Sequence, residues 1–305
     1  MRIDLGIIVH NEEKNIAKLL DSILKQNLSE VVIDRIIVVS SGSTDKTNDI
    51  VINYAKKYQK IKLLNQKRRE GKASAINEFL KEAKNNVVII SSGDIIFTEN
   101  AIKNLIKPFK DREVGLTSVN PIPVNLNNNL IGFIANMHWK LHNLLARHGE
   151  AIAFRKSIIF SLPKDIVADE AYIEAIVQKR KMKAIHVNDA IVFNKGPENI
   201  MDFIKQIRRH FFGHLQIKRK IGYSVSSLKI SEVKKAFTEL ARVSIKNPLK
   251  VHYFIVYIFL EVFGRFLGFL DFVSGRKNHV LWDIAWSTKD LREHKILQNS
   301  HFPVR

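Results

Sequence analysis

The acidic residue Asp94 directly follows a short apolar segment that has the composition of a buried strand. Residues 87–90 form an unbroken β-branched run, which is typical of parallel strands covered on both faces. Before this run, a turn at Gly71 and Lys72 leads into a helix whose apolar residues recur at helical spacing, namely Ala75, Ile76, Phe79, Leu80 and Ala83. In α/β proteins, ligands bind at the carboxyl ends of the strands. Asp94 is therefore expected at the rim of an active site, where a carboxylate can bind a cation or a polar ligand.

Two earlier segments repeat this alternation of strand and helix. Residues 4–9 are predicted to form a strand, residues 16–24 an amphipathic helix, and residues 35–40 a second strand that ends in a Ser-Gly-Ser-Thr-Asp turn. This order predicts an α/β fold with a parallel sheet. The loops at the carboxyl ends of its strands are expected to meet in space: residues 10–13, 40–45 and 91–94.

Several motifs lie in a fixed order along residues 1 to about 220: IIVHNEEKNIAKLLDSI, VVSSGSTDKT, EGKASAIN, SSGD, GEAIAFR, VADEAYIEA and the helix containing QIRRH. In this combination they resemble the family 2 glycosyltransferases with the GT-A fold, and several motifs in register are far more specific than any one. The resemblance implies a Rossmann-like, mixed and mostly parallel sheet flanked by helices. It also implies an enzyme of the hexosyltransferase type that uses a nucleotide-sugar donor.

The donor implied by this resemblance carries a diphosphate, whose departure leaves negative charge that a cation must stabilise. Hard oxygen ligands suit Mg²⁺ or Mn²⁺. The family's Asp-x-Asp turn corresponds here to Ser92, Gly93 and Asp94, so the second carboxylate is kept and a hydroxyl replaces the first. The resemblance thus implies that Asp94 holds the metal, together with diphosphate oxygens and water. The alternative is that Asp94 caps a helix starting near Thr98, although Thr98 itself supplies a start signal.

A second departure from the family concerns the nucleobase. Two aspartates usually follow the second strand in relatives, and one of them holds the base, whereas Ser40 and Ser41 stand here. A serine lacks the charge-assisted contact, so we expect weaker base binding or a different donor. The resemblance further implies donor contacts at the first strand's end, from Glu12 with His10 beside it, and at Lys72, which supports the leaving diphosphate.

The segment VADEAYIEAIVQKRKMKAIHV supplies the candidate catalytic base. When residues 179–187 are aligned with the corresponding strand of the family, Glu170 falls at the family's catalytic acidic position, with Asp169 as the alternative. A carboxylate at a helix N-terminus is stabilised as the anion, so its pKa falls unless burial raises it. The other interpretation is that both acids cap the helix, and it is weaker for Glu170 than for Asp169.

Gly149 and Glu150 precede a short strand, AIAFR, which lines the acceptor side in relatives. Glycine lets a backbone or a sugar approach closely. Two interpretations of Glu150 remain: it contacts the acceptor, or it is an acid of an edge strand that faces water.

Residues 198–220 are predicted to form an amphipathic helix with a basic face. The resemblance implies that this helix presents Gln206 and Arg209 to the donor diphosphate, with His210 in place of the family's tryptophan and Arg208 beside them. The apolar stripe, which includes Phe203 and Ile207, fits an interfacial helix on a membrane. It fits equally a helix packed on the globular core with a solvated basic face.

Residues 249–273 are predicted to form an apolar helix, interrupted by Glu261, Arg265 and Asp271. Glu261 and Arg265 stand one turn apart and can neutralise each other, while Gly264 and Gly268 favour close helix contact. We interpret this segment as a membrane-embedded or re-entrant helix. The domains expected are a catalytic domain at 1–220 and a helical, membrane-associated extension at 221–305, through which the chain is expected to form a homo-oligomer.

The 305 residues have a formal net charge of +19 and no cysteine. The charge implies attraction to anionic phospholipid or substrate phosphates, and the missing cysteines exclude disulfides and thiol chemistry. No aromatic-interleaved basic motif supports a nucleic-acid partner. The chain begins with a predicted strand rather than a leader peptide, so we expect it at the cytoplasmic side of the cell membrane.

The sequence therefore predicts an inverting glycosyltransferase that moves one sugar from a nucleoside diphosphate to a hydroxyl or lipid-phosphate acceptor. The alternative is a non-catalytic module that binds a sugar nucleotide or a glycan, because serines replace two acids of the family pattern. Binding of a nucleotide without sugar transfer would favour this alternative.

Overall fold

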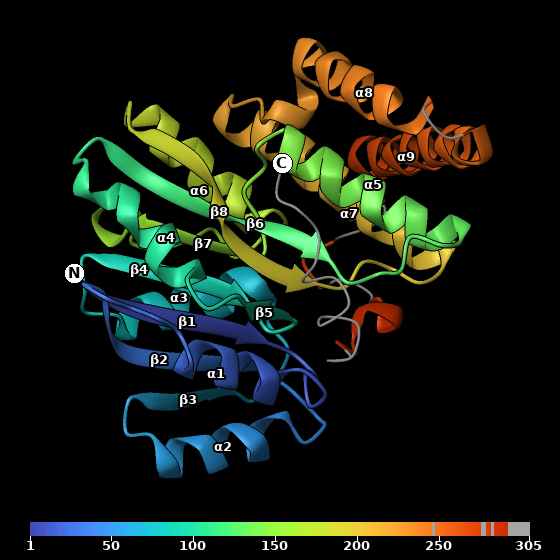
Figure 1. Cartoon of the computed structure of the whole chain (residues 1–305). Coiled ribbons are helices and arrows are strands. Elements are labelled where there is room, and N and C mark those ends of the chain that lie inside the picture. The colour runs from blue at the N-terminus through green and yellow to red at the C-terminus, as the bar shows by residue number, and fades with distance from the viewer. Residues whose placement is uncertain (246–247, 276–278, 282–283, 292–305) are drawn as a thin grey trace.

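The computed structural model describes residues 1–245, 248–275, 279–281 and 284–291. In these residues, eight strands form one sheet in the order β3-β2-β1-β4-β7-β6-β8-β5 (Figure 1). The strands are β1 (Arg2–Val9), β2 (Val32–Ser41), β3 (Ile61–Gln66), β4 (Val87–Ser92), β5 (Ile95–Phe97), β6 (Val114–Pro123), β7 (Ala151–Arg155) and β8 (Lys183–Asn194).

The first half of the sheet is parallel, as the alternation of strands and helices predicts. Strands β1, β2, β3 and β4 pair in parallel, and Val9 of β1 lies opposite Ser40 of β2 while Ile8 lies opposite Ser92 of β4. Strand β7 then runs antiparallel to both β4 and β6, and β8 is parallel to β6. The predicted mixed, mostly parallel α/β sheet is confirmed. Because the ends of β1, β2 and β4 are level, their loops emerge at one edge.

Helices cover both faces of the sheet (Figure 1). The α-helices of the described residues are α1 (Ile16–Leu24), α2 (Thr47–Lys57), α3 (Lys72–Glu82), α4 (Ala101–Ile106), α5 (Leu130–Leu144), α6 (Asp169–Lys179), α7 (Ile200–Ile221), α8 (Ile230–Ile245) and α9 (Pro248–Ser274). Four short 3₁₀ helices join them: η1 (Lys107–Lys110), η2 (Lys156–Ile158), η3 (Ser226–Leu228) and η4 (Trp286–Thr288).

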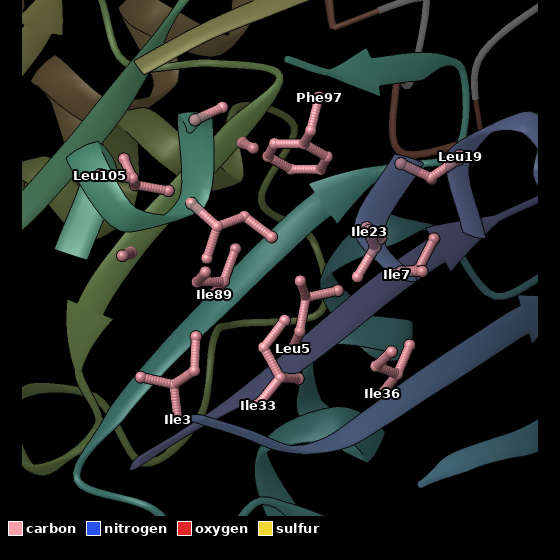
Figure 2. Packing of buried hydrophobic residues seen from close by; sticks show 14 of the residues in the cluster. Ile3, Leu5, Ile7, Leu19, Ile23, Ile33, Ile36, Ile89, Phe97 and Leu105 are labelled. Atoms are coloured by element: carbon pink, nitrogen blue, oxygen red, sulfur yellow. The ribbon is translucent and has the colours of Figure 1, made fainter. Parts of the chain in front are cut away.

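Alternate residues of the central strands pack against different helices. On one face, the strands share a hydrophobic cluster with α1, α2 and α4. Figure 2 shows part of this cluster, in which Leu5 and Ile7 of β1 lie close to Ile23 of α1 and Ile89 of β4. The other face packs against α3 and α6. Burial on both faces explains the continuous apolar runs that predict these strands.

Helix α3 lies very close to strand β1. A Cβ atom built on Gly6 would come within 2.6 Å of the Phe79 ring, which is fully buried. Such a contact leaves no room for a larger residue at position 6, so the glycine permits the close approach. The first residue of α3, Lys72, is thereby fixed beside the carboxyl ends of the strands.

A layer of helices at one end of the sheet consists of α5, α7, α8 and α9 (Figure 1). Phe203 and Ile207 of α7 are buried in a cluster with Phe133 of α5, Leu240 of α8 and Tyr257 of α9. The packed alternative for α7 is therefore present, whereas Ile204 and Phe211 of the same stripe are only half-buried, and the interfacial position of residues 198–220 remains a prediction. The domain boundary at residue 220 remains a prediction, and residues 292–305 of the expected extension lie outside the described residues.

Helix α9 is buried on one side and exposed on the other. Gly268 approaches α7 so closely that a Cβ would lie 2.5 Å from the Arg208 carbonyl oxygen, so the predicted small-residue face packs within the chain. The predicted neutralisation of Glu261 by Arg265 is confirmed, with 2.7 Å between their charged groups. Among the described residues, one helix is long and apolar enough to cross a membrane, Lys250–Ser274, with a mean hydropathy of 1.7. Its outward face presents large apolar side chains: Ile255, Phe259, Val262, Phe266 and Val273.

Candidate active site

The loops after β1 and β2 are joined by hydrogen bonds, as their expected convergence requires. The backbone N–H of Asn11 donates to Ser43 Oγ (3.1 Å), and the backbone N–H of Thr44 donates to Asn11 Oδ1 (2.8 Å). The backbone N–H of Glu12 donates to Thr47 Oγ1 (2.8 Å). The loop after β4 approaches β7. Residues of these loops, among them Glu12, Ser41 and Ser92, line a cavity at the carboxyl ends of the strands.

The cavity has a volume of about 210 Å³ and collects most of the residues predicted from the sequence. Asp94 and Glu170, which lie 76 positions apart in the sequence, both line it, so the central expectation of their convergence holds. The other predicted residues that line it are His10, Glu12, Ser41, Lys72, Ser92, Gly149, Glu150, Gln206, Arg209 and His210.

Two predicted residues do not line the cavity. Arg208 points from α7 toward α9 and forms a bidentate ion pair with Asp271, so its expected place beside the substrate is corrected. Successive residues of a helix project in different directions, and α7 therefore presents Arg209 to the cavity and Arg208 to α9. Asp169 is fully buried behind the cavity wall, 3.1 Å from Lys72 Nζ.

Lys72 links the two acids at the start of α6. Its ammonium forms ion pairs with Glu170 and with Asp169. Burial lowers the pKa of Lys72, but the charges of Asp169 and Glu170 outweigh burial and raise it. Burial raises the pKa of Glu170, yet the ammonium of Lys72 outweighs this effect and lowers it. For Asp169, burial and then the charge of Glu170 raise the pKa to about 6. Both acids are therefore mostly ionised at neutral pH, and Glu170 stays ionised to a lower pH than Asp169.

Glu150 and Asp94 form a second acidic pair. Strand β7 lies between β4 and β6 rather than at an edge, so the interpretation of Glu150 as a water-facing acid of an edge strand is wrong. Glu150 Oε1 accepts a hydrogen bond from Asn194 Nδ2 (2.9 Å), and its backbone adopts a left-handed φ of 59°. Burial and then the charge of Asp94 raise the pKa of Glu150 to about 8. Burial also raises the pKa of Asp94.

The cavity contains further residues that the sequence reasoning missed. None lies within the quoted motifs, although His214 is on the helix that contains QIRRH, and two of them come from the chain after α9. They are Arg69, His138, Trp139, His142, Arg147, His148, Asn194, Lys195, His214, Thr288 and Lys289. Lys289 forms an ion pair with Glu12 and lies 3.8 Å from Asp94 Oδ2. Burial lowers the pKa of Lys289 to about 8, while the adjacent carboxylate of Glu12 favours the charged ammonium.

We call the part of the cavity around Arg147 the Arg147 end, where the guanidinium lies near His142 and His210. Burial, followed by the charge of Arg147, holds the pKa of His142 and of His210 well below the usual range. These rings are therefore neutral at physiological pH, and Arg147 carries the positive charge of this end. Among the described residues, no side-chain hydrogen bond or ion pair engages the Arg147 guanidinium, and no partner engages Trp139 Nε1. The end of the cavity thus presents hydrogen-bond donors.

Buried histidines also make the fold sensitive to acid. His148 Nδ1 and His186 Nδ1 both contact Ser118 Oγ, at 2.8 Å and 3.1 Å. Burial and then His148 lower the pKa of His186 to about 4, against about 6.5 in an unfolded chain. The unfolded chain therefore takes up a proton here between about pH 6.5 and pH 4, which the folded chain does not. The free energy of unfolding falls as the pH drops through this window.

We expect the variant His186→Gln to reduce this pH dependence by at most about 1.4 kcal/mol per pH unit, the limit for one proton. Denaturant unfolding at pH 7, 6, 5 and 4.5 measures how the free energy of unfolding depends on pH. His252→Gln, at an exposed histidine of α9, is the control and should follow the wild type. A slope for His186→Gln equal to that of the wild type would show that this histidine is not the acid-sensitive group.

The fold is of a class found in solved glycosyltransferases. It superposes on a mannosyltransferase from Pyrobaculum calidifontis, in complex with GDP-Man and Mn²⁺, with a TM-score of 0.65 at 18% identity, covering 90% of this chain and 88% of that one. It also superposes on glucosyl-3-phosphoglycerate synthase from Mycobacterium tuberculosis, in complex with Mn²⁺, UDP and phosphoglyceric acid, with a TM-score of 0.51 at 17% identity. That match covers 71% of this chain and 78% of the synthase. These similarities establish the GT-A fold.

The sequence assigns the family. The model of glycosyl transferase family 2 matches residues 4–162, a little over half of the chain, so the chain belongs to this family. A segment of 97 residues is 36% identical to a dolichyl-phosphate beta-glucosyltransferase of Trichomonas vaginalis. This match covers 30% of the chain and 30% of that relative, so the chain matches about a third of the relative's length.

Proposed function

We propose that the chain is an inverting glycosyltransferase that moves a hexose from a nucleoside diphosphate to a phosphate-bearing lipid acceptor. The observation that carries this proposal is the convergence of Asp94, Glu170 and Arg147 on one cavity at the carboxyl ends of the strands. Asp94 marks the donor end, Arg147 marks the acceptor end, and Glu170 supplies a base.

The donor end has the groups that a nucleoside diphosphate requires. His10, Glu12 and Ser41 line the part of the cavity formed by β1 and β2, where the nucleoside binds in this proposal. Arg209 of α7 and Lys72 of α3 support the diphosphate, because the charge that develops on leaving oxygens is stabilised by fixed cations. A titration with nucleotides of different bases is needed to identify the base, since Ser41 offers a hydroxyl in place of a carboxylate.

The oxygen ligands beside the donor end fit a hard divalent cation. The carboxylates of Asp94 and Glu150 are close enough for the charge of one to raise the pKa of the other, and the Ser92 hydroxyl lines the same wall. Among the described residues, no three histidine, cysteine or acidic side chains form a complete metal site. We therefore assign Asp94 as the protein ligand of Mg²⁺ or Mn²⁺, because such ions bind through one or two carboxylates plus phosphate oxygens and water. The bound ion supplies positive charge beside the leaving phosphate.

We assign Glu170 as the base that removes the proton of the acceptor. One base and a direct displacement by the acceptor invert the configuration at the anomeric carbon. The pKa of Glu170 is lowered by Lys72, so its carboxylate is a weak base. A phosphate monoester loses its second proton near pH 6, whereas an alcohol holds its proton far more tightly. A weak base is therefore matched to a phosphate acceptor rather than to a hydroxyl.

The acceptor end independently favours a phosphate. Arg147 and Trp139 present hydrogen-bond donors, and the rings of His142 and His210 are neutral at physiological pH. A guanidinium binds a phosphate through two parallel hydrogen bonds, and the phosphate supplies acceptor oxygens for the indole N–H as well. The name of the Trichomonas vaginalis relative, a dolichyl-phosphate glucosyltransferase, supports the same acceptor class.

A lipid acceptor requires a membrane surface, and α9 offers an apolar face for it. Phe259, Val262 and Phe266 of this helix are more than half exposed. Together with the net charge of +19, this face supports binding to an anionic bilayer at the cytoplasmic side of the cell membrane. Self-association through the helical layer remains a further proposal.

The test is a transfer assay with UDP-, GDP- and dTDP-hexoses, Mn²⁺, and polyprenyl phosphate or its dephosphorylated alcohol in anionic vesicles. We expect transfer to the phosphate and none to the alcohol. We expect Arg147→Gln to raise the KM for polyprenyl phosphate by about 10- to 100-fold, since a lost charge-assisted hydrogen bond costs about 1.5–3 kcal/mol. Hydrolysis of the donor without acceptor should be unchanged.

Lys140→Gln is the matched control, because Lys140 is an exposed cation on α5, the helix that ends shortly before Arg147. Its KM should equal that of the wild type. Transfer to the alcohol in preference to the phosphate would contradict the acceptor assignment, whereas nucleotide binding without any transfer would favour a non-catalytic binding module.

A further inference from the structure

A segment after α9 crosses the donor end of the cavity. We call residues 284–291 the C-terminal strap. Its Ile284, Ala285, Thr288 and Lys289 line the cavity wall. The strap therefore adds a wall to the site that none of the family motifs contains.

The strap is attached on both sides of the cavity. On one side, the Leu291 amide donates to Asn15 Oδ1 (3.0 Å) at the start of α1, and Lys18 Nζ donates to the Leu291 carbonyl oxygen. On the other side, Ser287 Oγ donates to Asp202 Oδ2 (2.7 Å) in the first turn of α7. These anchors fix the strap between α1 and α7 and so fix the backbone of Lys289.

The Lys289 side chain is directed at the two acids of the donor end. It forms an ion pair with Glu12, and its Nζ lies 3.8 Å from Asp94 Oδ2. The side chain is 19% exposed and that of Glu12 is 4% exposed, so both charges are largely removed from water. A buried charge is stable only beside a counter-charge, so the position of Lys289 depends on anionic groups at this place.

The charge balance of the donor end explains why a cation is needed there. A diphosphate that binds next to Asp94 also approaches Glu12, and these carboxylates repel it. Among the cavity's other cations, Lys72 is paired with Asp169 and Glu170, and Lys195 is paired with Glu198 at 2.9 Å. Arg69, Arg147 and Arg209 also line the cavity, but among the ion pairs of the described residues Lys289 is the cation that lies within 4.0 Å of both Glu12 and Asp94.

We propose that Lys289 is a donor-binding residue whose ammonium contacts a diphosphate oxygen of the nucleotide sugar beside Asp94. A lysine suits this role, because its charge sits on a flexible four-carbon stem and can move between neighbouring anions. This inference rests on the proposed function, since it presupposes a nucleoside diphosphate donor. It adds to the site a charge carried by the strap, a segment outside the region matched by the family model.

The test compares binding of UDP and GDP with binding of uridine and guanosine, by calorimetry, with and without Mn²⁺. We expect Lys289→Gln to weaken binding of the diphosphates by about 10- to 100-fold, the effect of one charge-assisted hydrogen bond. Binding of the nucleosides, which carry no phosphate, should be unchanged. Lys289→Arg should restore most of the diphosphate affinity. Hydrogen exchange of residues 284–291 should slow when UDP or GDP binds to the wild type and should change less in Lys289→Gln.

Two further variants serve as controls. Lys14→Gln removes the same charge from an exposed site near α1 and should bind diphosphates like the wild type. Glutamine at position 289 leaves Glu12 unpaired, so the comparison is repeated in a Glu12→Gln background, where adding Lys289→Gln should again weaken diphosphate binding selectively.

The outcomes separate this inference from the proposed function. If the wild type binds UDP or GDP and Lys289→Gln binds it equally or more tightly, Lys289 is not a donor-binding residue, although the proposed function stands. Equal losses for nucleosides and diphosphates would show that Lys289 has a structural role, and would overturn the inference as well. If the wild type binds no nucleoside diphosphate, the proposed function itself is wrong.

Discussion

Replacing Glu170 by glutamine should lower the rate of sugar transfer to a phosphate acceptor by about 10-fold at pH 5, because only about a tenth of the acceptor has lost its second proton there. Glutamine keeps the shape of the side chain and cannot accept the acceptor's proton. Binding of the nucleoside diphosphate should change little, because Lys72 keeps its second partner, Asp169. The measurement is the rate of transfer at saturating donor, together with calorimetric titration of UDP or GDP.

The pH dependence of this defect distinguishes the acceptor classes. A phosphate acceptor loses its own proton around pH 6, so the defect of Glu170→Gln should shrink between pH 5 and pH 8. A hydroxyl acceptor would instead give a defect of about 10²- to 10⁴-fold that stays constant over this range. Glu174→Gln is the matched control: it lies one turn further along α6 and hydrogen-bonds Tyr223 (2.6 Å) outside the cavity. Full activity of Glu170→Gln and loss of activity in Asp169→Asn would reassign the base to Asp169.

Replacing Asp94 by asparagine should reduce transfer by about 10²- to 10³-fold, the usual loss when one group that stabilises transition-state charge is removed. An amide oxygen carries no formal charge and binds Mg²⁺ or Mn²⁺ more weakly than a carboxylate. The loss should therefore be accompanied by loss of the extra thermal stabilisation that Mn²⁺ adds to a bound nucleoside diphosphate. Thermal unfolding with the nucleotide, with and without Mn²⁺, measures this second effect.

Glu99→Gln provides the comparison for Asp94, because Glu99 is an exposed acid just beyond β5. It should keep the response to Mn²⁺ and the rate of transfer. An Asp94→Asn protein that still responds to Mn²⁺ would place the metal on other ligands. A rate equal to that of the wild type would remove Asp94 from the mechanism.

The sequence predicted the parts of the site that belong to the sheet. Apolar runs and helical spacing identify β1, β2, β4 and the helices between them, and the topology of parallel strands then requires that the loops bearing Glu12, Ser41 and Asp94 meet. Glu170 required a further step, the resemblance of its motif to the family. Local pattern and motif order together therefore locate the residues that we propose for the donor end and the base.

Contacts between distant side chains were beyond the sequence. Arg208 and Arg209 are adjacent and chemically alike, and the packing of α9 against α7 decides which of them faces the cavity. The strand that follows Glu150 has no feature that distinguishes an edge strand from a central one. Lys289 stands in a segment without periodicity or motif, so its place beside Glu12 is visible only once the chain has folded back onto α1.

The position of α7 between the cavity and α9 has a consequence for shortening the protein. On one side α7 presents Gln206 and Arg209 to the cavity, and on the other side it packs against the glycines of α9 and holds Asp271 through Arg208. Removing the apolar helix to gain solubility would expose this packed surface and loosen the support of the Arg209 guanidinium. Helix α9 thus acts as an internal brace of the candidate site, and detergent or nanodisc preparations that retain it are the appropriate material for kinetics.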